Sequence, residues 1–284
     1  AGDIGVGGRE IGYLYGQYKR NRGLYEGVLT GKGLSYGGSL IRTQATGYGL
    51  VYMLNEMVKA KNDTISGKTL IVTGSGNVAI YAVEKAAELG GKVVAMCDSN
   101  GYIYDPDGIS GEKIDYMLEL RASGNDIVAP YAEKYPGATF VEGKRPWEVK
   151  ADIALPCATQ NEINKVEAQR LADSGCYAVC EGANMPTNAE ATEVFLDRDI
   201  LFLPGKASNA GGVATSALEM GQNSIRSSWT FDEVDAKLKG IMINIYYHMK
   251  EACEQFDAKD NFVAGANIAG FMKVADAMMA QGIV

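Results

Sequence analysis

The sequence predicts an α/β protein with a doubly wound sheet in the middle of the chain and helices at both ends. Three observations predict this fold class. Short, continuous apolar runs recur between residues 68 and 205, helix-forming segments separate them, and only helix-forming segments follow residue 209. Continuous apolar runs are typical of strands buried on both faces of a parallel sheet. Alternation of strand and helix with short joints is typical of doubly wound sheets.

The predicted strands are short runs rich in Val, Ile, Leu, Ala and Phe. They are residues 68–74, 92–98, 138–143, 151–157, 176–182 and 199–205. The segments between them carry apolar residues at helical spacing. These predicted helices are residues 77–91, 111–123, 162–175 and 188–199.

The two ends of the chain also have the apolar spacing of amphipathic helices. Near the start, these are residues 8–20 and 48–61, with a polar, glycine-rich stretch between them. After the last predicted strand come residues 213–229, 231–256 and 263–282. We therefore expect a central sheet domain flanked by helices that belong to another, incomplete domain.

Composition excludes several classes of function. The net charge of −8 does not favour binding to nucleic acid or to an anionic membrane surface, because both select for basic patches. No apolar run approaches the roughly 20 residues that cross a bilayer, and no secretory signal is present, so we expect a cytoplasmic protein. The 5 cysteines are scattered in apolar runs, which favours buried, reduced thiols. Cys176 and Cys180 with the single histidine, His248, are too few ligands for a zinc site, and we expect no metal.

The strongest local motif is G-x-G-x-x-A at residues 74–79, between a predicted strand and a predicted helix. Gly74 permits a tight turn, Gly76 lets the backbone approach a pyrophosphate, and Ala79 lets the helix pack closely on the sheet. The amides at the start of the helix then face the anion. This context predicts a Rossmann-type dinucleotide site. Its candidate contacts are Gly74, Ser75, Gly76, Asn77 and Val78.

The residues after the second predicted strand do not decide between NAD and NADP. A carboxylate such as Asp98 at this position accepts from the ribose 2′-hydroxyl of NAD and repels a 2′-phosphate. Ser99, however, can donate to a phosphate, and Arg121 can supply positive charge. Local chemistry therefore leaves both coenzymes open.

Longer stretches across the whole chain carry a more specific pattern. They include "AGDIGVGGREIGYLYGQYK", "GSGNVAIYAVEKAAELGGKV", "DIALPCATQNEIN", "EGANMPT" and "GKASNAGGVATSALEM". Residues 29–52 and 265–282 continue the pattern. Together these stretches resemble the hexameric glutamate dehydrogenases, most closely the bacterial NADP-dependent type. Members of that family carry a further domain before the stretch that matches residues 1–7, and it holds most subunit contacts and the lysines that bind and activate the oxo acid.

The resemblance implies roles for individual residues. Asp3 matches the catalytic aspartate of the family, although by local chemistry it is an ordinary loop residue. Five residues match coenzyme contacts of the family. Thr46, Asn184 and Asn209 match contacts to the nicotinamide and its ribose, and Ala158 and Thr159 lie in the loop after the predicted strand 151–157. Ser216 matches the residue that meets the side-chain carboxylate of the substrate, and Val213 lines the same pocket.

The resemblance also implies the family reaction, in which L-glutamate, water and NADP⁺ give 2-oxoglutarate, ammonium and NADPH. "DSNG" at 98–101, Ser75 and Arg121 fit the NADP type, so we expect NADP, with NAD as the alternative. The implied domains are residues 1–45 as the end of a substrate domain, 46–262 as the dinucleotide domain, and 263–284 as a helix returning to the substrate domain. We expect coenzyme binding without turnover by this chain alone and a hexamer for the whole enzyme. The alternatives are a leucine or phenylalanine dehydrogenase and a non-catalytic NADP-binding module.

Overall fold

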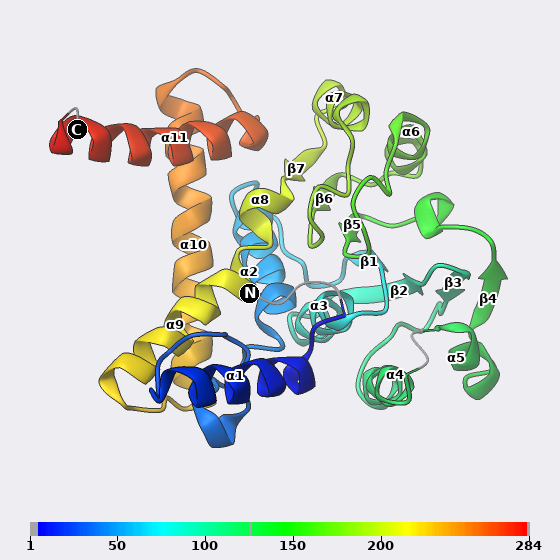
Figure 1. The fold of residues 1–284 in the computed structure, drawn as a ribbon. Helices are drawn as coiled ribbons and strands as arrows, with labels where there is room; N and C mark the ends of the chain where they lie inside the picture. Colours follow the sequence, from blue (N-terminus) through cyan, green and yellow to red (C-terminus); the bar gives the residue numbers. More distant parts are fainter. Residues whose placement is uncertain (1–4, 125–126, 283–284) are drawn as a thin grey trace.

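The computed structural model describes residues 5–124 and 127–282, and its centre is a seven-stranded sheet (Figure 1). The strand order is β4-β3-β2-β1-β5-β6-β7. The strands are β1 (Thr69–Thr73), β2 (Lys92–Cys97), β3 (Gly101–Tyr104), β4 (Thr139–Glu142), β5 (Ile153–Pro156), β6 (Ala178–Cys180) and β7 (Leu201–Leu203). Each strand predicted from an apolar run is a strand of this sheet, which confirms the α/β fold class.

The central strand, β1, pairs in parallel with β2 on one side and β5 on the other. The chain leaves β1 towards β2 and returns later to β5, so the strand order reverses beside β1. In open α/β sheets, ligands bind at such a switch point, outside the carboxyl ends of the strands.

One strand differs from the expected parallel pattern. β3 is antiparallel to both β2 and β4. The sequence did not indicate it because its four residues alternate between buried and partly buried positions and form no continuous apolar run. The sheet is therefore mixed, with β3 inserted between β2 and β4.

Helices cover both faces of the sheet and extend beyond it (Figure 1). They are α1 (Gly8–Arg22), α2 (Ala45–Lys59), α3 (Asn77–Glu88), α4 (Glu112–Ala122), α5 (Ala129–Lys134), α6 (Lys165–Asp173), α7 (Ala189–Asp197), α8 (Gly205–Ser208), α9 (Gly211–Ile225), α10 (Phe231–Gln255) and α11 (Phe262–Gln281), with 3-10 turns η1 (Leu34–Tyr36) and η2 (Pro146–Glu148). The short helices α5 and α8 were not expected, because fewer than two turns give no apolar period.

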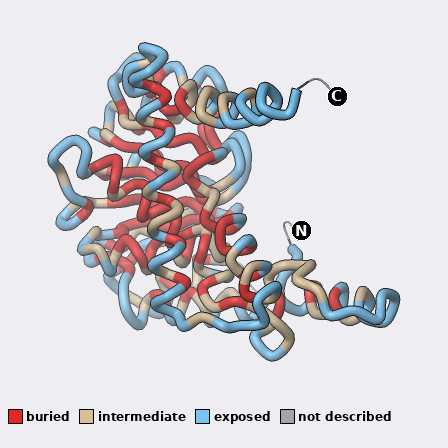
Figure 2. The backbone as a smooth tube through the Cα atoms, turned by 90° about the vertical axis from the view of Figure 1, so that its left-hand side faces the viewer, coloured by how far each residue is buried: buried red, intermediate tan, exposed pale blue. Residues whose placement is uncertain are grey.

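Two hydrophobic cores lie on opposite faces of the sheet. Leu70 and Val72 of β1 belong to the core that includes α2, α3 and α10, whereas Ile71 between them belongs to the core that includes α6 and α7. Figure 2 shows the buried residues gathered in the middle of the molecule and the C-terminal helix projecting from it with mostly exposed residues. Among the described residues, no helix is long and apolar enough to cross a membrane.

Helix α2 occupies the centre of the larger core and approaches α3 through a glycine. A Cβ built on Gly47 meets the amide nitrogen of Ala82 at 2.5 Å and the carbonyl oxygen of Val78 at 2.7 Å, both on α3. Real Cβ atoms do not come this close to backbone atoms. Gly47 therefore sets the distance between α2 and the helix that follows the glycine loop.

Replacing Gly47 with Ala should destabilise the fold, because backbone atoms of α3 have to move. We expect a loss of about 1–3 kcal/mol in the free energy of unfolding, measured with denaturant. The matched control is Gly240→Ala in α10, where nothing lies within 4 Å of the added methyl group. That change should be neutral or stabilising by up to about 1 kcal/mol. Equal effects of the two substitutions would contradict this packing.

Candidate functional site

The glycine loop lies where β1 ends and α3 begins, beside the loop that follows β5. Gly74 has φ +96°, a conformation that favours glycine, and a Cβ there would lie 3.0 Å from the Cys157 carbonyl oxygen and 3.1 Å from Ala158 Cα. The N-cap of α3 is Gly76, and within residues 5–124 and 127–282 no side chain caps its first amides. Amides at such a helix start can bind a phosphate.

A buried carboxylate joins the two loops. Glu162 Oε1 accepts from the Thr73 hydroxyl at 2.8 Å and from the Ala158 amide at 3.2 Å. The Thr73 hydroxyl also accepts from the Cys157 amide at 3.1 Å. This network connects the carboxyl end of β1 to that of β5 under the glycine loop.

Glu162 was not among the residues expected from the sequence. Its second oxygen, Oε2, is buried and has no hydrogen-bond partner among the described residues. Burial raises the pKa of its carboxyl to about 7, although the bonds from Thr73 and Ala158 and the charge of Arg145 oppose this rise. A glutamate in the loop that follows the predicted strand 151–157, in "ATQNE", was the available signal.

Asp98 directly follows β2, and its side chain bonds the neighbouring backbone. Its Oδ1 accepts from the amides of Asn100 at 2.6 Å and Gly101 at 3.1 Å, and its Oδ2 accepts from the Val128 amide at 2.7 Å. The side chain is buried, whereas Ser99 is exposed. Both oxygens of Asp98 therefore bond the backbone, and the contact of this carboxylate with a coenzyme ribose stays a prediction.

Arg121 lies at the glycine loop, as expected. It comes from the last turn of α4, and its Nη1 is 3.4 Å from the position that a Cβ would take on Gly76. The structure thus brings a guanidinium from a distant helix to the start of α3. The remaining loop residues, Ser75, Asn77 and Val78, are partly buried.

Two of the residues expected at the nicotinamide end contact each other. Asn209 Nδ2 donates to Asn184 Oδ1 at 2.6 Å, which joins the loop after β6 to the end of α8. Thr46 lies on α2, and its hydroxyl is 2.6 Å from the position of a Cβ on Gly212. Thr159, in the loop after β5, is exposed.

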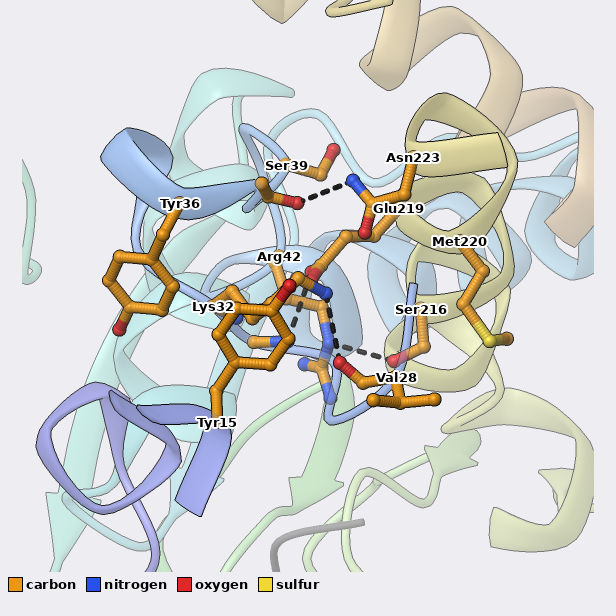
Figure 3. Close-up of polar contacts among 12 residues, drawn as sticks. Tyr15, Val28, Lys32, Tyr36, Ser39, Arg42, Ser216, Glu219, Met220 and Asn223 are labelled. Atoms are coloured by element: carbon orange, nitrogen blue, oxygen red, sulfur yellow. Dashed lines mark hydrogen bonds and ion pairs between the residues drawn. The ribbon is translucent and has the colours of Figure 1, made fainter. Parts of the chain in front are cut away.

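Ser216 is buried on α9 and accepts a hydrogen bond from Arg42 Nε at 2.9 Å (Figure 3). Arg42 precedes α2 in the chain and was not expected at the site. Val213, on the same helix as Ser216, is 70% exposed. The Ser216 hydroxyl is thus bonded to the Arg42 guanidinium, near the residues expected at the nicotinamide end.

One turn beyond Ser216, α9 carries a fully buried ion pair. Lys32 Nζ lies 2.6 Å from Glu219 Oε1, and both side chains have 0% exposure (Figure 3). Glu219 also accepts from the amide of Gly31 at 2.9 Å and from that of Lys32 at 3.4 Å. Neither member of the pair was expected from the sequence. The pair fixes the glycine-rich segment before α2 against α9.

Asp3, the expected catalytic residue, lies outside the described residues. The expected buried thiols are confirmed, since all 5 cysteines are buried and unpaired. A hollow of about 790 Å³ lies at the opposite edge of the sheet, near Tyr177 and Leu201. Two residues of its lining, Lys61 and Asp260, form an ion pair at 2.6 Å.

Comparison with known proteins identifies the family to which this chain is similar. Residues 37–282 match the family described as Glutamate/Leucine/Phenylalanine/Valine dehydrogenase. The chain is 59% identical to an NAD-specific glutamate dehydrogenase of Bacteroides fragilis and 55% identical to an NADP-specific glutamate dehydrogenase of Haemophilus influenzae, in each case over 100% of its length. It spans 64% and 63% of those two proteins. A crystal structure of Plasmodium falciparum glutamate dehydrogenase superposes with a TM-score of 0.96 at 46% identity, covering 100% of this chain and 61% of that one.

The carboxyl of Glu162 should make stability depend on pH. Its pKa is raised from 4.5 to about 7 in the folded chain. The contribution of its protonation to the free energy of unfolding is therefore fully present below about pH 4.5 and is lost as the pH rises through 7. Between about pH 5 and pH 8, the wild type should lose about 2 kcal/mol more unfolding free energy than Glu162→Gln. Denaturant unfolding at the two pH values measures this difference, and parallel pH profiles of the two proteins would contradict it.

Proposed function

This chain belongs to the Glutamate/Leucine/Phenylalanine/Valine dehydrogenase family, and we propose that it is the coenzyme-binding part of an NADP-dependent glutamate dehydrogenase. One observation carries the proposal. The uncapped start of α3 lies at the switch point of the sheet, with glycines that leave its backbone open and Arg121 beside it. Open amides at the start of a helix and an adjacent guanidinium suit a phosphorylated dinucleotide.

The carboxyl edge of the sheet fits a dinucleotide along its length. Residues 74–78 would hold the pyrophosphate, and Ser99 with Arg121 would hold the adenosine ribose. The nicotinamide end of the dinucleotide would lie against the loops after β5 and β6 and against α2. Its contacts there would be Thr46, Ala158, Thr159, Asn184 and Asn209. When bound, the nicotinamide supplies the hydride acceptor, and the protein orients the ring and excludes water.

The choice of NADP rests on how Asp98 is used. A ribose 2′-phosphate is repelled by a free carboxylate at the end of the second strand. In this chain, three backbone amides occupy the oxygens of Asp98, and Ser99 remains exposed. The relatives carry both NAD-specific and NADP-specific names, so NAD is the alternative.

Ser216 and Arg42 support a substrate with an acidic side chain. The Ser216 hydroxyl is buried and already accepts from a guanidinium, so the remaining hydroxyl proton needs an acceptor. The side-chain carboxylate of glutamate is such an acceptor, whereas the aliphatic side chain of leucine would leave that proton without an acceptor. We therefore favour glutamate and 2-oxoglutarate over the substrates of a leucine or phenylalanine dehydrogenase.

Oxidative deamination moves protons at nitrogen and oxygen through an imine and a carbinolamine, which requires a general acid and base near the reacting carbon. We assign this role to Asp3. The resemblance implies that the oxo-acid lysines of the family precede the stretch that matches residues 1–7, and the chain spans 64% of its Bacteroides relative. We therefore propose that residues 1–284 bind coenzyme but need the region with these lysines for turnover.

The proposed domains follow the same division. Residues 1–45 would end the substrate domain, 46–262 would form the dinucleotide domain, and 263–284 would return to the substrate domain. In support, the core ends at Phe262, and beyond it α11 exposes Phe271, Val274 and Met278. We expect a hexamer for the whole enzyme in the cytoplasm. Reading the gene upstream of codon 1 separates this proposal from a non-catalytic coenzyme-binding module.

Isothermal titration of the 284-residue chain with NADPH tests coenzyme binding directly. We expect saturable binding and no glutamate-dependent reduction of NADP⁺ by the same preparation, because a substrate-binding region is missing. No heat at saturating NADPH and NADH would reject the coenzyme site. Glutamate-dependent turnover by this chain alone would reject the assignment of the substrate lysines to a missing region.

Ser216→Ala should separate acidic from apolar substrates in the enzyme that joins this chain to a substrate domain. Loss of a hydrogen bond to a charged group is worth about 1.5–3 kcal/mol, so kcat/KM for glutamate should fall by roughly 10–100-fold. Activity on leucine should not fall. The control is Ser224→Ala, because Ser224 is exposed on the same helix and bonds only the carbonyl of Met220. An equal loss for glutamate and leucine would contradict the proposed contact.

A further inference from the structure

We propose that Arg145 selects NADP over NAD by bonding the 2′-phosphate of the adenosine ribose. This inference rests on the proposed function and extends it by one specificity-determining residue. Arg145 follows β4 and is the N-cap of η2, and neither its position in the chain nor its neighbours in the sequence indicated a role at the site. The structure places it at the carboxyl end of β2, where the second ribose of a dinucleotide lies in this fold.

Two contacts fix one edge of the guanidinium against β2. Its Nη1 donates to the carbonyl oxygen of Asp98 at 3.0 Å and to Cys97 Sγ at 3.3 Å. Cys97 Sγ also accepts from the Gly74 amide at 3.4 Å. Burial raises the pKa of the Cys97 thiol, so it stays neutral and does not balance the charge of Arg145. Only one sulfur atom separates this guanidinium from the first glycine of the phosphate loop.

The other edge of the guanidinium has unused donors. An arginine carries five N–H groups, and Nη1 supplies two of them. Within residues 5–124 and 127–282, Nε and Nη2 of Arg145 make no hydrogen bond, and the side chain forms no ion pair with a carboxylate. The side chain is half-buried, and its bonds to Asp98 and Cys97 hold the Nη1 edge in place. A fork of unused donors matches a phosphate better than a hydroxyl.

The surrounding charges favour a phosphate at this point. The carboxylate that would have bonded a 2′-hydroxyl, Asp98, is bonded to three amides. Ser99, directly after it, is exposed and offers a hydroxyl. The buried Glu162 is the acidic group that, besides Asp98, acts on Arg145, and its carboxyl is partly protonated near neutral pH because its pKa is about 7. The end of β2 therefore presents a fixed cation without a free carboxylate.

A purely structural arginine would have the same two contacts, so the test must separate specificity from stability. The variants are Arg145→Gln, which removes the charge, and Arg145→Lys, which keeps it. The matched control is Lys144→Gln, which makes the same charge change at the exposed neighbouring residue. Titration calorimetry gives Kd for NADPH and for NADH with each variant of the 284-residue chain, and denaturant unfolding gives its stability.

We expect Arg145→Gln to raise the Kd for NADPH roughly 10–100-fold, because a charge-assisted hydrogen bond is lost. The Kd for NADH should stay within about twofold of the wild-type value. Arg145→Lys should retain part of the preference, and Lys144→Gln should bind both coenzymes as the wild type does. An equal loss for both coenzymes, an unchanged Kd for NADPH, or a wild type that prefers NADH would overturn the role of Arg145. Failure of the wild type to bind either coenzyme would instead reject the proposed function on which the inference rests.

Discussion

The carboxylate of Glu162 holds together the two loops between which we propose the coenzyme site. It joins the hydroxyl at the end of β1 to the amide after β5. Because these loops meet, Gly74 adopts φ +96° against the Cys157 carbonyl, and α3 begins with open amides at the switch point of the sheet. One oxygen of the same carboxylate is buried and has no partner among the described residues. The buried group avoids the cost of an unpaired charge because its raised pKa lets it bind a proton readily. The geometry of the phosphate loop therefore depends on an ionisable group beneath it.

A second buried group of charges positions the substrate side of the site. Lys32 and Glu219 form their ion pair with 0% exposure, and two backbone amides complete the bonds of the carboxylate. Loss of one partner from such a pair leaves an uncompensated charge, at a cost of about 3–5 kcal/mol, even where the net contribution of the pair is small. Its main effect is on arrangement, because it fixes the segment that carries Arg42 against the helix that carries Ser216.

The sequence predicted the fold well where the physical signal is local. Continuous apolar runs identified every parallel strand, and helical spacing identified the long helices, whereas β3 was too short and alternating to be recognised. The phosphate loop was predicted because glycine spacing and a helix start are contiguous. Arg42, Lys32 and Glu219 were missed because their partners lie 174 and 187 residues away in the chain. The bonds of Asp98 could not be predicted either, because no sequence shows that backbone amides of Asn100, Gly101 and Val128 donate to its oxygens.

The central claim is that the carboxyl edge of this sheet, and no other surface of the chain, binds a phosphorylated nicotinamide coenzyme. Amide hydrogen exchange with and without NADPH tests it most directly, since bound ligand slows exchange where it orders the backbone. The account predicts slower exchange in residues 74–79, 98–101 and 158–162, and unchanged exchange at the opposite edge around the hollow near Tyr177. Protection confined to that opposite edge, with residues 74–79 unaffected by saturating NADPH, would contradict it.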